Sequence, residues 1–454
     1  MSLVRSYTVS WLIWVLTLVA CGHRGDGDGD AGAPAADACE GLGCAIVDCA
    51  AQGLPPTSLS GTVTAPNHTL PLYGVTVYVP AHDPGALSRG VACTPCTADL
   101  PGGALAQTTT DENGQFTLTG VPAAASVPVV VQVGKWRRQL TVATVPACRD
   151  TALEPAATAL PRNRGEGDLP HIAITTGNAD ALECLVRKLG VDDAELTTDG
   201  GAGAVHLYAG NGASKFATGF AGGSGNFAAA STLWSTVDKL SAYDIALFSC
   251  EGGQHAETKP LSALQAVHDF ADRGGRLFLS HWHNIWIAGN QADPTWAIPE
   301  WQAIATFDFG AAQNETTQLT IVDESVPKGS AFATWLQNVG ASVQRDEVVV
   351  AEPRYTCQSV DTSKGERWVY VDPTRSTPLG KTGVQDMLFT TPQRQSADAR
   401  CGKVVFSDMH VSSGSTSKAS VAFPGGCSSA PLSAQEKALA FIFFDIASCT
   451  GWIQ

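Results

Sequence analysis

The sequence is poor in charge, and above all in positive charge. Charged residues make up 16% of the 454 residues, and 28 Lys and Arg face 43 Asp and Glu, which leaves a formal net charge of -15. No basic stripe is visible in any segment. Because phosphate backbones are bound by clustered Lys and Arg, this balance argues against a nucleic acid partner.

Motifs for nucleotide phosphates and for paired-cysteine zinc sites are also missing. The glycine-rich stretch GNGASKFATGFAGGSGN has no following Gly-Lys-Ser/Thr and is not a dinucleotide fingerprint. The one CxxC, Cys93 to Cys96, has no second close pair, which a zinc site of that type needs. Disulfides are the better interpretation of the cysteines, and Cys93 and Cys96 are expected to form a local bridge.

A short apolar segment near the N-terminus predicts export. WLIWVLTLVA follows Arg5 and is shorter than the about 20 apolar residues that a membrane-spanning helix needs. It ends in Leu-Val-Ala-Cys, which resembles a bacterial lipobox with Cys21 as the acylated residue; an ordinary cleaved signal is the alternative. We expect a lipoprotein signal peptide over 1–20, a membrane anchor at Cys21, and a flexible Gly/Asp/Ala tether with a cysteine cluster over 21–57.

Export also bears on the remaining cysteines. Of the 13 cysteines, all but the lipidated Cys21 are available to pair, an even number in a compartment that permits disulfides. Gly22 rather than Asp after the lipidated cysteine favours the outer membrane. The predicted location is therefore the cell envelope, with a lipid anchor in the outer membrane.

Residues 58–148 have the pattern of short β-strands. LSGTVTA, GVTVYVP and VPVVVQVGKWRRQLTV alternate apolar and polar residues, which predicts a small antiparallel β-sandwich. The motif T-D-x-x-G-x-F, ending at Phe116, and the motifs around it resemble the carboxypeptidase regulatory-like, or transthyretin-like, domain. The resemblance implies an accessory or binding module without chemistry of its own. A Pro- and Ala-rich linker is expected over 149–168.

From residue 169 to 454, predicted strands alternate with predicted helices. The strands LPHIAITTG, YDIALFSC and RLFLSHW are separated by helical patterns such as DALECLVRKLG and PLSALQAVHDFADRGG. This alternation predicts a three-layer α/β domain with a mostly parallel sheet, whose binding crevice lies at the carboxyl ends of the strands. Residues 290–400 form an insertion that the pattern does not assign. The chain is thus expected to be multidomain.

Two longer motifs carry a family resemblance. YDIALFSCEGG, a helix and DRGGRLFLSHWHN resemble trehalose-utilisation-like (ThuA-like) proteins of the class I glutamine amidotransferase-like superfamily. CGKVVFSDMHVSSG resembles the later strand that brings a second histidine to the same edge. The two-part layout also resembles a family of bacterial lipoproteins. The tryptophan synthase alpha chain label that some of its members carry has no support here, because an eightfold barrel would fill about 250 residues with regular repeats.

Polar residues that end the predicted strands are expected to converge on one rim of the sheet. They are Cys250, Glu251, His281, His283, Asp408 and His410. His281, His283 and His410 could bind a divalent metal such as zinc, since a His-x-His pair on a strand points both rings to one side. Alternatively, His281 or His410 acts as a general base that Asp408 or Glu251 orients. A polar-tipped core beside Trp282 and Trp286 is the interpretation without a site.

Cys250 is a weaker candidate for a nucleophile. Its C-x-G-x-Q stretch resembles the nucleophile turn of class I glutamine amidotransferases. In that layout, however, the turn follows the next strand along the chain, where Ser280 or His281 stands. Cys250 is therefore expected to be a disulfide partner or a buried thiol.

Together these features predict an exported cell-envelope lipoprotein that binds a ligand, such as a carbohydrate or another envelope protein. Its amidotransferase-like domain is expected to be catalytically degenerate and to need no cofactor. The alternative is a hydrolase, metal-dependent and acting on carbohydrate. Its catalytic residues would be His281, His410, Asp408 and Glu251.

Overall fold

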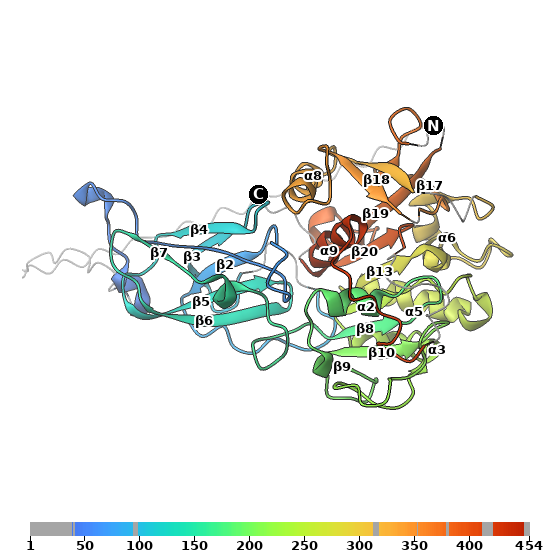
Figure 1. Cartoon of the computed structure of the whole chain (residues 1–454), viewed down its shortest axis with the longest axis horizontal. Coiled ribbons are helices and arrows are strands. Elements are labelled where there is room, and N and C mark those ends of the chain that lie inside the picture. The colour runs from blue at the N-terminus through green and yellow to red at the C-terminus, as the bar shows by residue number, and fades with distance from the viewer. Residues whose placement is uncertain are drawn as a thin grey trace, which may run out of the picture. The chain divides into compact units, whose positions relative to one another are not determined.

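The computed structural model of the chain (Figure 1) is mixed α/β with several sheets, which agrees with the prediction that strands and helices are both present. It describes residue 39 and residues 41–93, 99–311, 317–351, 353–377, 381–410 and 421–448. Cys21, the predicted signal peptide and most of the predicted tether lie outside the described residues. Gly41–Gln454 forms one compact unit. None of the helices in the described ranges is both long and apolar enough to cross a membrane.

Residues 58–152, here called the β-region, form two sheets. Their strand orders are β4-β1-β7 and β3-β2-β5-β6. The strands are β1 (Ser58–Thr62), β2 (Thr76–Pro80), β3 (Ala104–Thr109), β4 (Gln115–Thr119), β5 (Ala125–Val133), β6 (Trp136–Thr144) and β7 (Asp150–Ala152). Strand β7 pairs in parallel with β1. The first part of the predicted linker, 149–168, therefore belongs to a sheet.

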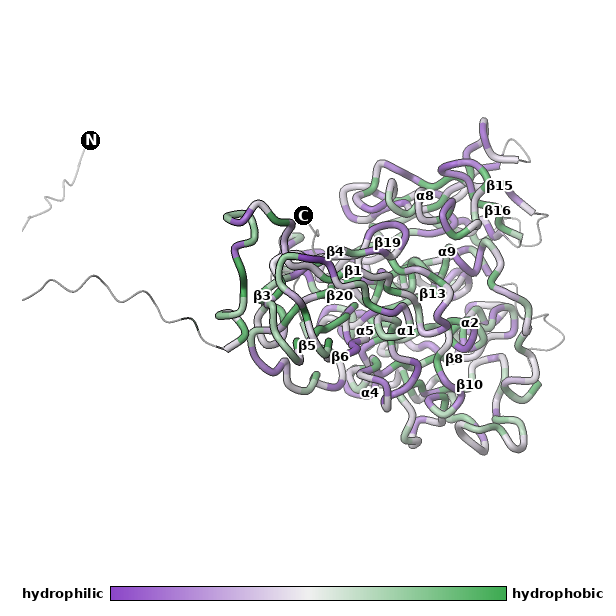
Figure 2. The backbone as a smooth tube through the Cα atoms, turned by 60° about the vertical axis from the view of Figure 1, so that its left-hand side comes forward, coloured by the Kyte–Doolittle hydropathy of each residue, from purple (hydrophilic) through white to green (hydrophobic). Residues whose placement is uncertain are grey.

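The turn between β3 and β4 shows why the sequence folds this way locally. The Asp111 Oδ1 atom accepts hydrogen bonds from the backbone N–H groups of Asn113 and Gln115, each at 2.8 Å. Gly114 has a φ of 71°, and a Cβ there would lie 2.6 Å from the Val63 carbonyl oxygen, so the position requires glycine. Beyond the turn, exposed and buried residues alternate along β4. Figure 2 shows that hydrophobic and hydrophilic residues are mixed along the backbone of the described elements.

Residues 169–448, the α/β region, contain one large sheet. Its order is β11-β10-β8-β12-β13-β20-β19-β18-β15-β16, with β9 beside β10. Neighbours from β11 to β20 are parallel and those from β20 to β16 are antiparallel. The segment 290–400, unassigned from the sequence, supplies the antiparallel half.

The strands of this sheet are β8 (Ile172–Thr175), β9 (Leu196–Thr197), β10 (Val205–Ala209), β11 (Ala228–Ala229), β12 (Ile245–Phe248), β13 (Arg276–Ser280), β15 (Gln318–Val322), β16 (Glu347–Val350), β18 (Glu366–Val371), β19 (Gly383–Thr391) and β20 (Gly402–Ser407). A separate pair consists of β14 (Ala305–Phe307) and β17 (Cys357–Val360).

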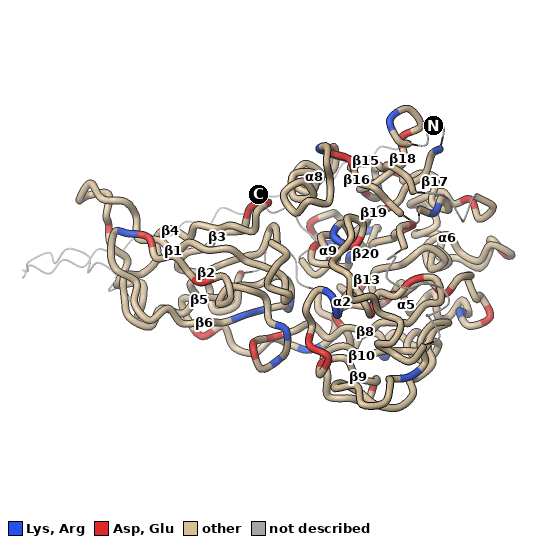
Figure 3. The backbone as a smooth tube through the Cα atoms, viewed as in Figure 1, with Lys and Arg blue, Asp and Glu red and all other residues tan. Residues whose placement is uncertain are grey.

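Acidic and basic residues are interspersed over the described elements, as Figure 3 shows.

Helices form in the predicted segments DALECLVRKLG and PLSALQAVHDFADRGG of the α/β region. The α-helices are α1 (Pro155–Thr158), α2 (Leu182–Lys188), α3 (Ala230–Leu233), α4 (Val237–Ser241), α5 (Leu261–Asp272), α6 (Ile285–Ala288), α7 (Pro299–Gln302), α8 (Gly329–Asn338) and α9 (Ala434–Ala447). The 3-10 helices are η1 (Gly41–Ala45), η2 (Ala50–Gln52), η3 (Asp193–Glu195), η4 (Ala256–Thr258), η5 (His281–Asn284) and η6 (Ala397–Ala399). In α5, Leu264, Val267 and Ala271 recur at helical spacing and are buried.

Disulfides connect segments that are far apart in the sequence. They join Cys49 to Cys148, Cys93 to Cys401 and Cys184 to Cys427, and Cys39 and Cys44 are disulfide-bonded as well. The predicted local bridge between Cys93 and Cys96 is therefore wrong. The insertion between β2 and β3 runs against the α/β region, and the Ala92 carbonyl oxygen lies so close to Gly274 that a Cβ there would be 2.5 Å away. This path brings Cys93 to Cys401.

Helix α9 is buried between the two regions. It begins with a capping box of Ser433 and Glu436, and its apolar residues face both sides of the helix. On one side, the Phe443 ring lies 5.5 Å from the ring of Trp136 in the β-region. On the other, the Phe441 ring lies 4.7 Å from the ring of Phe332 in α8. The β-region and the α/β region therefore share one apolar core.

A cluster of charged side chains lies at the C-terminal end of α9. The Asp445 carboxylate pairs with Lys328, and its Oδ2 atom lies 3.1 Å from Lys403 Nζ. Burial alone would raise the pKa of Asp445, but the charges of the two lysines and their hydrogen bonds lower it below its usual value. Lys403 Nζ also donates to the Asp445 carbonyl oxygen at 2.8 Å, which ties α9 to β20.

Replacing Asp445 with Asn should lower the free energy of unfolding at pH 7 by about 3–5 kcal/mol, because the buried Lys403 and the partly buried Lys328 would lose their counter-charge. The Asp445 pKa is lower in the folded chain than in the unfolded chain. Its stabilisation is therefore present above the unfolded pKa and is lost as pH falls through the lowered value. The difference between the two proteins should shrink below about pH 4.

Guanidinium chloride unfolding with the disulfides intact, at a series of pH values, measures this difference. Asp361→Asn is the matched control, since Asp361 pairs with Lys364 on the surface and its loss should leave stability nearly unchanged. Equal losses in the two variants would contradict a stabilising role for the charged cluster.

Candidate functional site

The strand β13 ends in a strained turn at His281. The strand is buried throughout, and the 3-10 helix η5 begins at the very next residue. His281 has a φ of 39°, in the left-handed region that residues other than glycine seldom adopt. A side chain on such a sharp strand-to-helix turn is held at the carboxyl edge of the sheet, as in nucleophile elbows. Here the residue on the turn is a histidine.

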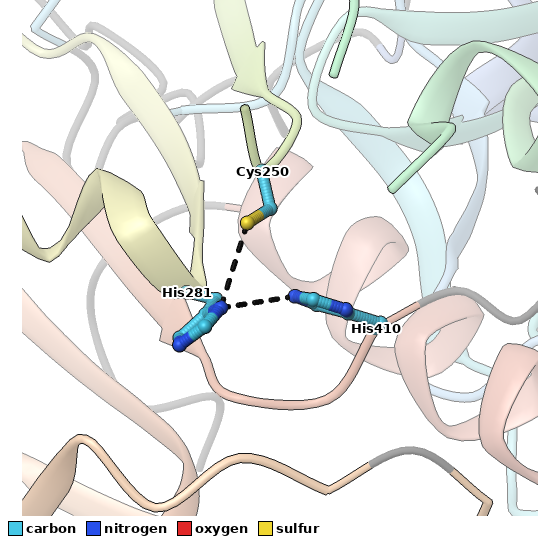
Figure 4. A group of neighbouring side chains, drawn as sticks. All are labelled: Cys250, His281 and His410. Atoms are coloured by element: carbon cyan, nitrogen blue, oxygen red, sulfur yellow. Dashed lines mark hydrogen bonds between the residues drawn. The ribbon is translucent and has the colours of Figure 1, made fainter. Parts of the chain in front are cut away.

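Cys250, His281 and His410 meet at this edge (Figure 4). They follow the strands β12, β13 and β20, which are parallel neighbours, so their carboxyl ends lie side by side. The His281 Nδ1 atom is 3.5 Å from Cys250 Sγ and 3.2 Å from His410 Nε2. The three side chains are buried, at 0%, 2% and 1% exposure. They form a group that could hold a metal ion.

His283 does not join this group. Its Nε2 atom lies 3.0 Å from the Ser249 carbonyl oxygen, and its Nδ1 atom accepts a hydrogen bond from Trp286 Nε1 at 2.8 Å. The reason is local: residues two apart share a side in a strand, but in the 3-10 helix η5 they are about 240° apart. The rings of His281 and His283 therefore diverge, and Cys250 takes the place beside His281 and His410.

The two predicted carboxylates are engaged elsewhere at the rim. Glu251 forms a buried ion pair with Lys259. Burial lowers the pKa of Lys259 below its ordinary value, although the charge of Glu251 acts to raise it. Asp408 accepts hydrogen bonds from Thr356 Oγ1 and from the Cys357 backbone N–H, both at 2.8 Å. Burial raises the Asp408 pKa to about 7 despite these bonds. The hydrogen bonds of both carboxylates therefore join neighbouring segments of the chain to each other.

Asp180 and Arg354 also lie at the rim and were missed by sequence reasoning. Ser280 Oγ donates a 2.6 Å hydrogen bond to Asp180, which lies in the loop after β8 and is buried. Arg354, in the segment before β17, is close enough to His410 for its charge to lower the His410 pKa. Asp180 could have been found from its place after a predicted strand. Arg354 lies in the unassigned segment, where no motif marks it.

The electrostatics of the site favour neutral side chains. Burial raises the pKa of the Cys250 thiol to about 12, so the sulfur is protonated at neutral pH. Burial, together with His281 and Arg354, lowers the pKa of His410 well below its ordinary value. A protonated thiol is a poor nucleophile. Neutral imidazoles and a thiol that a cation can deprotonate are, however, the donors that zinc and copper prefer.

Comparisons with known proteins do not assign the chain to a family. No protein-family model and no curated protein matches it. Two solved structures, interface mutants of a type II cohesin–X-dockerin complex from Acetivibrio cellulolyticus, have TM-scores of 0.16. The C-terminal interface mutant is 15% identical over 31% of this chain and 75% of that chain. The N-terminal interface mutant is 17% identical over 33% of this chain and 88% of that chain.

Thiol labelling should separate the buried cysteines from the bridged ones. Cys250 and Cys357 are fully buried free thiols, so both should resist alkylation in the native protein and react after unfolding without reductant. Unreduced peptide mapping by mass spectrometry should find Cys93 linked to Cys401. Cys250 in a disulfide would contradict the structure of the site.

Proposed function

We propose that the protein is an exported cell-envelope protein that binds a ligand and whose amidotransferase-like α/β region is catalytically degenerate. The observation that carries this proposal is the histidine on the turn after β13. His281 holds the strained turn after β13, and the resemblance to amidotransferase-like proteins implies that an active member would carry its nucleophile at that turn. The thiol beside His281, that of Cys250, follows the preceding strand and is fully buried and protonated.

The rim instead serves as a metal centre. Cys250, His281 and His410 supply one thiol and two imidazoles, and their donor atoms all lie within 4.8 Å of one another. One sulfur and two nitrogens are typical zinc ligands, and zinc binding would deprotonate the thiol. The three residues end three neighbouring strands, so a shared ion would tie these strand ends together. We therefore propose a zinc site that stabilises the rim.

The chain carrying Cys21→Ser should bind one zinc ion. Cys250→Ser, His281→Ala and His410→Ala should each weaken zinc binding by at least about tenfold, because each removes a ligand. His82→Ala, at an exposed histidine, is the control and should bind zinc like the parent. Metal analysis after dialysis gives the stoichiometry. Cobalt substitution should give a sulfur-to-cobalt absorption band that Cys250→Ser lacks.

Two outcomes would contradict the metal centre. One is a parent protein that retains no zinc or cobalt at micromolar metal concentrations. The other is a Cys250→Ser variant that binds cobalt as tightly as the parent, with the same spectrum. Preferential loading with copper would keep the centre and correct the choice of metal.

A metal-dependent hydrolase is the second candidate function. The observation in its favour is that three protein ligands leave a fourth position, which in catalytic zinc sites holds water. Hydrolysis of chromogenic esters or glycosides by the zinc-loaded protein, abolished in Cys250→Ser, would favour this candidate. Zinc binding without turnover would favour the degenerate domain.

Export and lipid anchoring rest on the lipobox at Cys21. Acylation of one cysteine should make the chain fractionate with membranes, and Cys21→Ser should release it to the soluble fraction. Ser10→Ala, in the same leader but away from the lipobox, should leave fractionation unchanged. A Cys21→Ser protein that still sediments with membranes would contradict the lipid anchor. Carbohydrate or another envelope protein is the proposed ligand class at this location.

A further inference from the structure

A cavity lies between the β-region and the amino ends of β12 and β13, at the edge of the sheet opposite to Cys250. Its volume is about 340 Å³, within the range of small-molecule sites. Side chains of Leu87, Val91, Leu100, Val133 and Ile245 line it, so most of its wall is apolar. Ligands of α/β sheets usually bind at the carboxyl edge, so the fold class alone does not predict this cavity.

A second, more polar chamber of about 260 Å³ adjoins the first. The two chambers share Leu87, Ser88, Lys135 and Asp244 in their walls. The second chamber also contains Arg89, Arg164 and His171. An apolar chamber thus continues into a chamber that carries basic side chains.

The described parts of the insertion between β2 and β3, residues 81–93 and 99–103, line the chambers, and residues 88–93 are held in place from several directions. Lys135 Nζ donates to the carbonyl oxygens of Ser88 at 2.7 Å and Gly90 at 2.6 Å. The Val91 N–H donates to the Ser241 carbonyl oxygen at 3.0 Å. The Cys93–Cys401 disulfide fixes the end of the same stretch. The wall is therefore built into the fold rather than left to a loose loop.

The charges of the polar chamber do not cancel. Lys135 pairs with Asp244 at 2.5 Å, Arg164 pairs with Glu195 at 3.0 Å, and Asp168 pairs with Arg137 at 2.7 Å. Arg89 has no ion pair or hydrogen bond within the described part of the chain. After these pairings one positive charge remains in the polar chamber. It belongs to Arg89, which lies on the insertion that also lines the apolar chamber. An anionic group there would meet an available guanidinium.

We propose that these joined chambers bind a small amphipathic anion, with its apolar body against Val91, Val133 and Ile245 and its anionic group at Arg89. The proposal deepens the proposed binding role, on which it rests, by naming the site and the class of ligand. An alkyl chain with a carboxylate or a phosphate head has this chemistry. The apolar chamber buries the chain, and the guanidinium of Arg89 selects the negative head.

Isothermal titration of the full chain with decanoate, decyl phosphate, decanol and decyltrimethylammonium tests the proposal. The two anions should bind one per chain, and the alcohol and the cation at least about tenfold more weakly, because only an anion completes the interaction with Arg89. The tighter of the two anions identifies the head group. Inorganic phosphate alone should not bind measurably, since it lacks the apolar body.

Two variants with matched controls locate the site. Arg89→Gln should weaken decanoate binding about tenfold, whereas Arg375→Gln, at an exposed arginine outside the cavity, should not. Val91→Phe should weaken all alkyl ligands at least about tenfold by filling the apolar chamber. Val343→Phe, at a side chain that is 99% exposed, should have no effect.

Decanol binding as tight as decanoate binding, or equal effects of the two arginine substitutions, would overturn the proposal. Absence of binding of both decanoate and decyl phosphate by the parent protein would also overturn it. Zinc content, measured on the same samples, distinguishes this failure from failure of the proposed metal centre. Retained zinc without binding of either anion contradicts the cavity proposal alone.

Discussion

The burial of α9 on both of its sides is the contact on which the rest of the structure depends. Its phenylalanines pack against Trp136 of the β-region and against Phe332 of α8. Asp445 at its end gives two lysines their counter-charge, and one of these, the buried Lys403, lies in β20 at the centre of the sheet. Without α9, the β-region and the α/β region would each expose an apolar face. The helix therefore makes one core out of two patterns that look like separate domains in the sequence.

This packing gives the sheet two edges of different character. At the carboxyl edge, the ends of β12, β13 and β20 carry the buried side chains of Cys250, His281 and His410. At the amino edge, the insertion between β2 and β3 covers the starts of β12 and β13 and leaves a cavity. The strands that separate the edges are four to five residues long, or about 13–17 Å. The same strands thus position the proposed metal centre and the cavity without bringing them into contact.

Much of this arrangement could be predicted from the sequence, for physical reasons that differ from element to element. YDIALFSC and RLFLSHW are short apolar runs bounded by polar residues, and a buried parallel strand needs little more than that. The meeting of Cys250, His281 and His410 follows from the rule that parallel strands end at one edge. His283 could not be placed in this way, because the backbone leaves the strand at His281 and turns into a 3-10 helix. The antiparallel half of the sheet also escaped prediction, because the sequence of its short strands does not indicate their direction. Strands β15 and β16 pair in antiparallel fashion even though helix α8 lies between them in the chain.

The sequence by itself determined the local features of this protein: strand and helix periodicity, the Asp111 to Gly114 turn, the low positive charge and the strand ends that carry polar side chains. These depend on interactions between residues close together in the chain. The tertiary structure alone decided that Cys93 pairs with Cys401, that Cys250 stays a free thiol beside His281, and that an insertion encloses a cavity. Each of these requires residues about 30 to 300 positions apart to meet. Which distant segments meet is set by the packing of α9 and the order of the strands, and no local pattern encodes it.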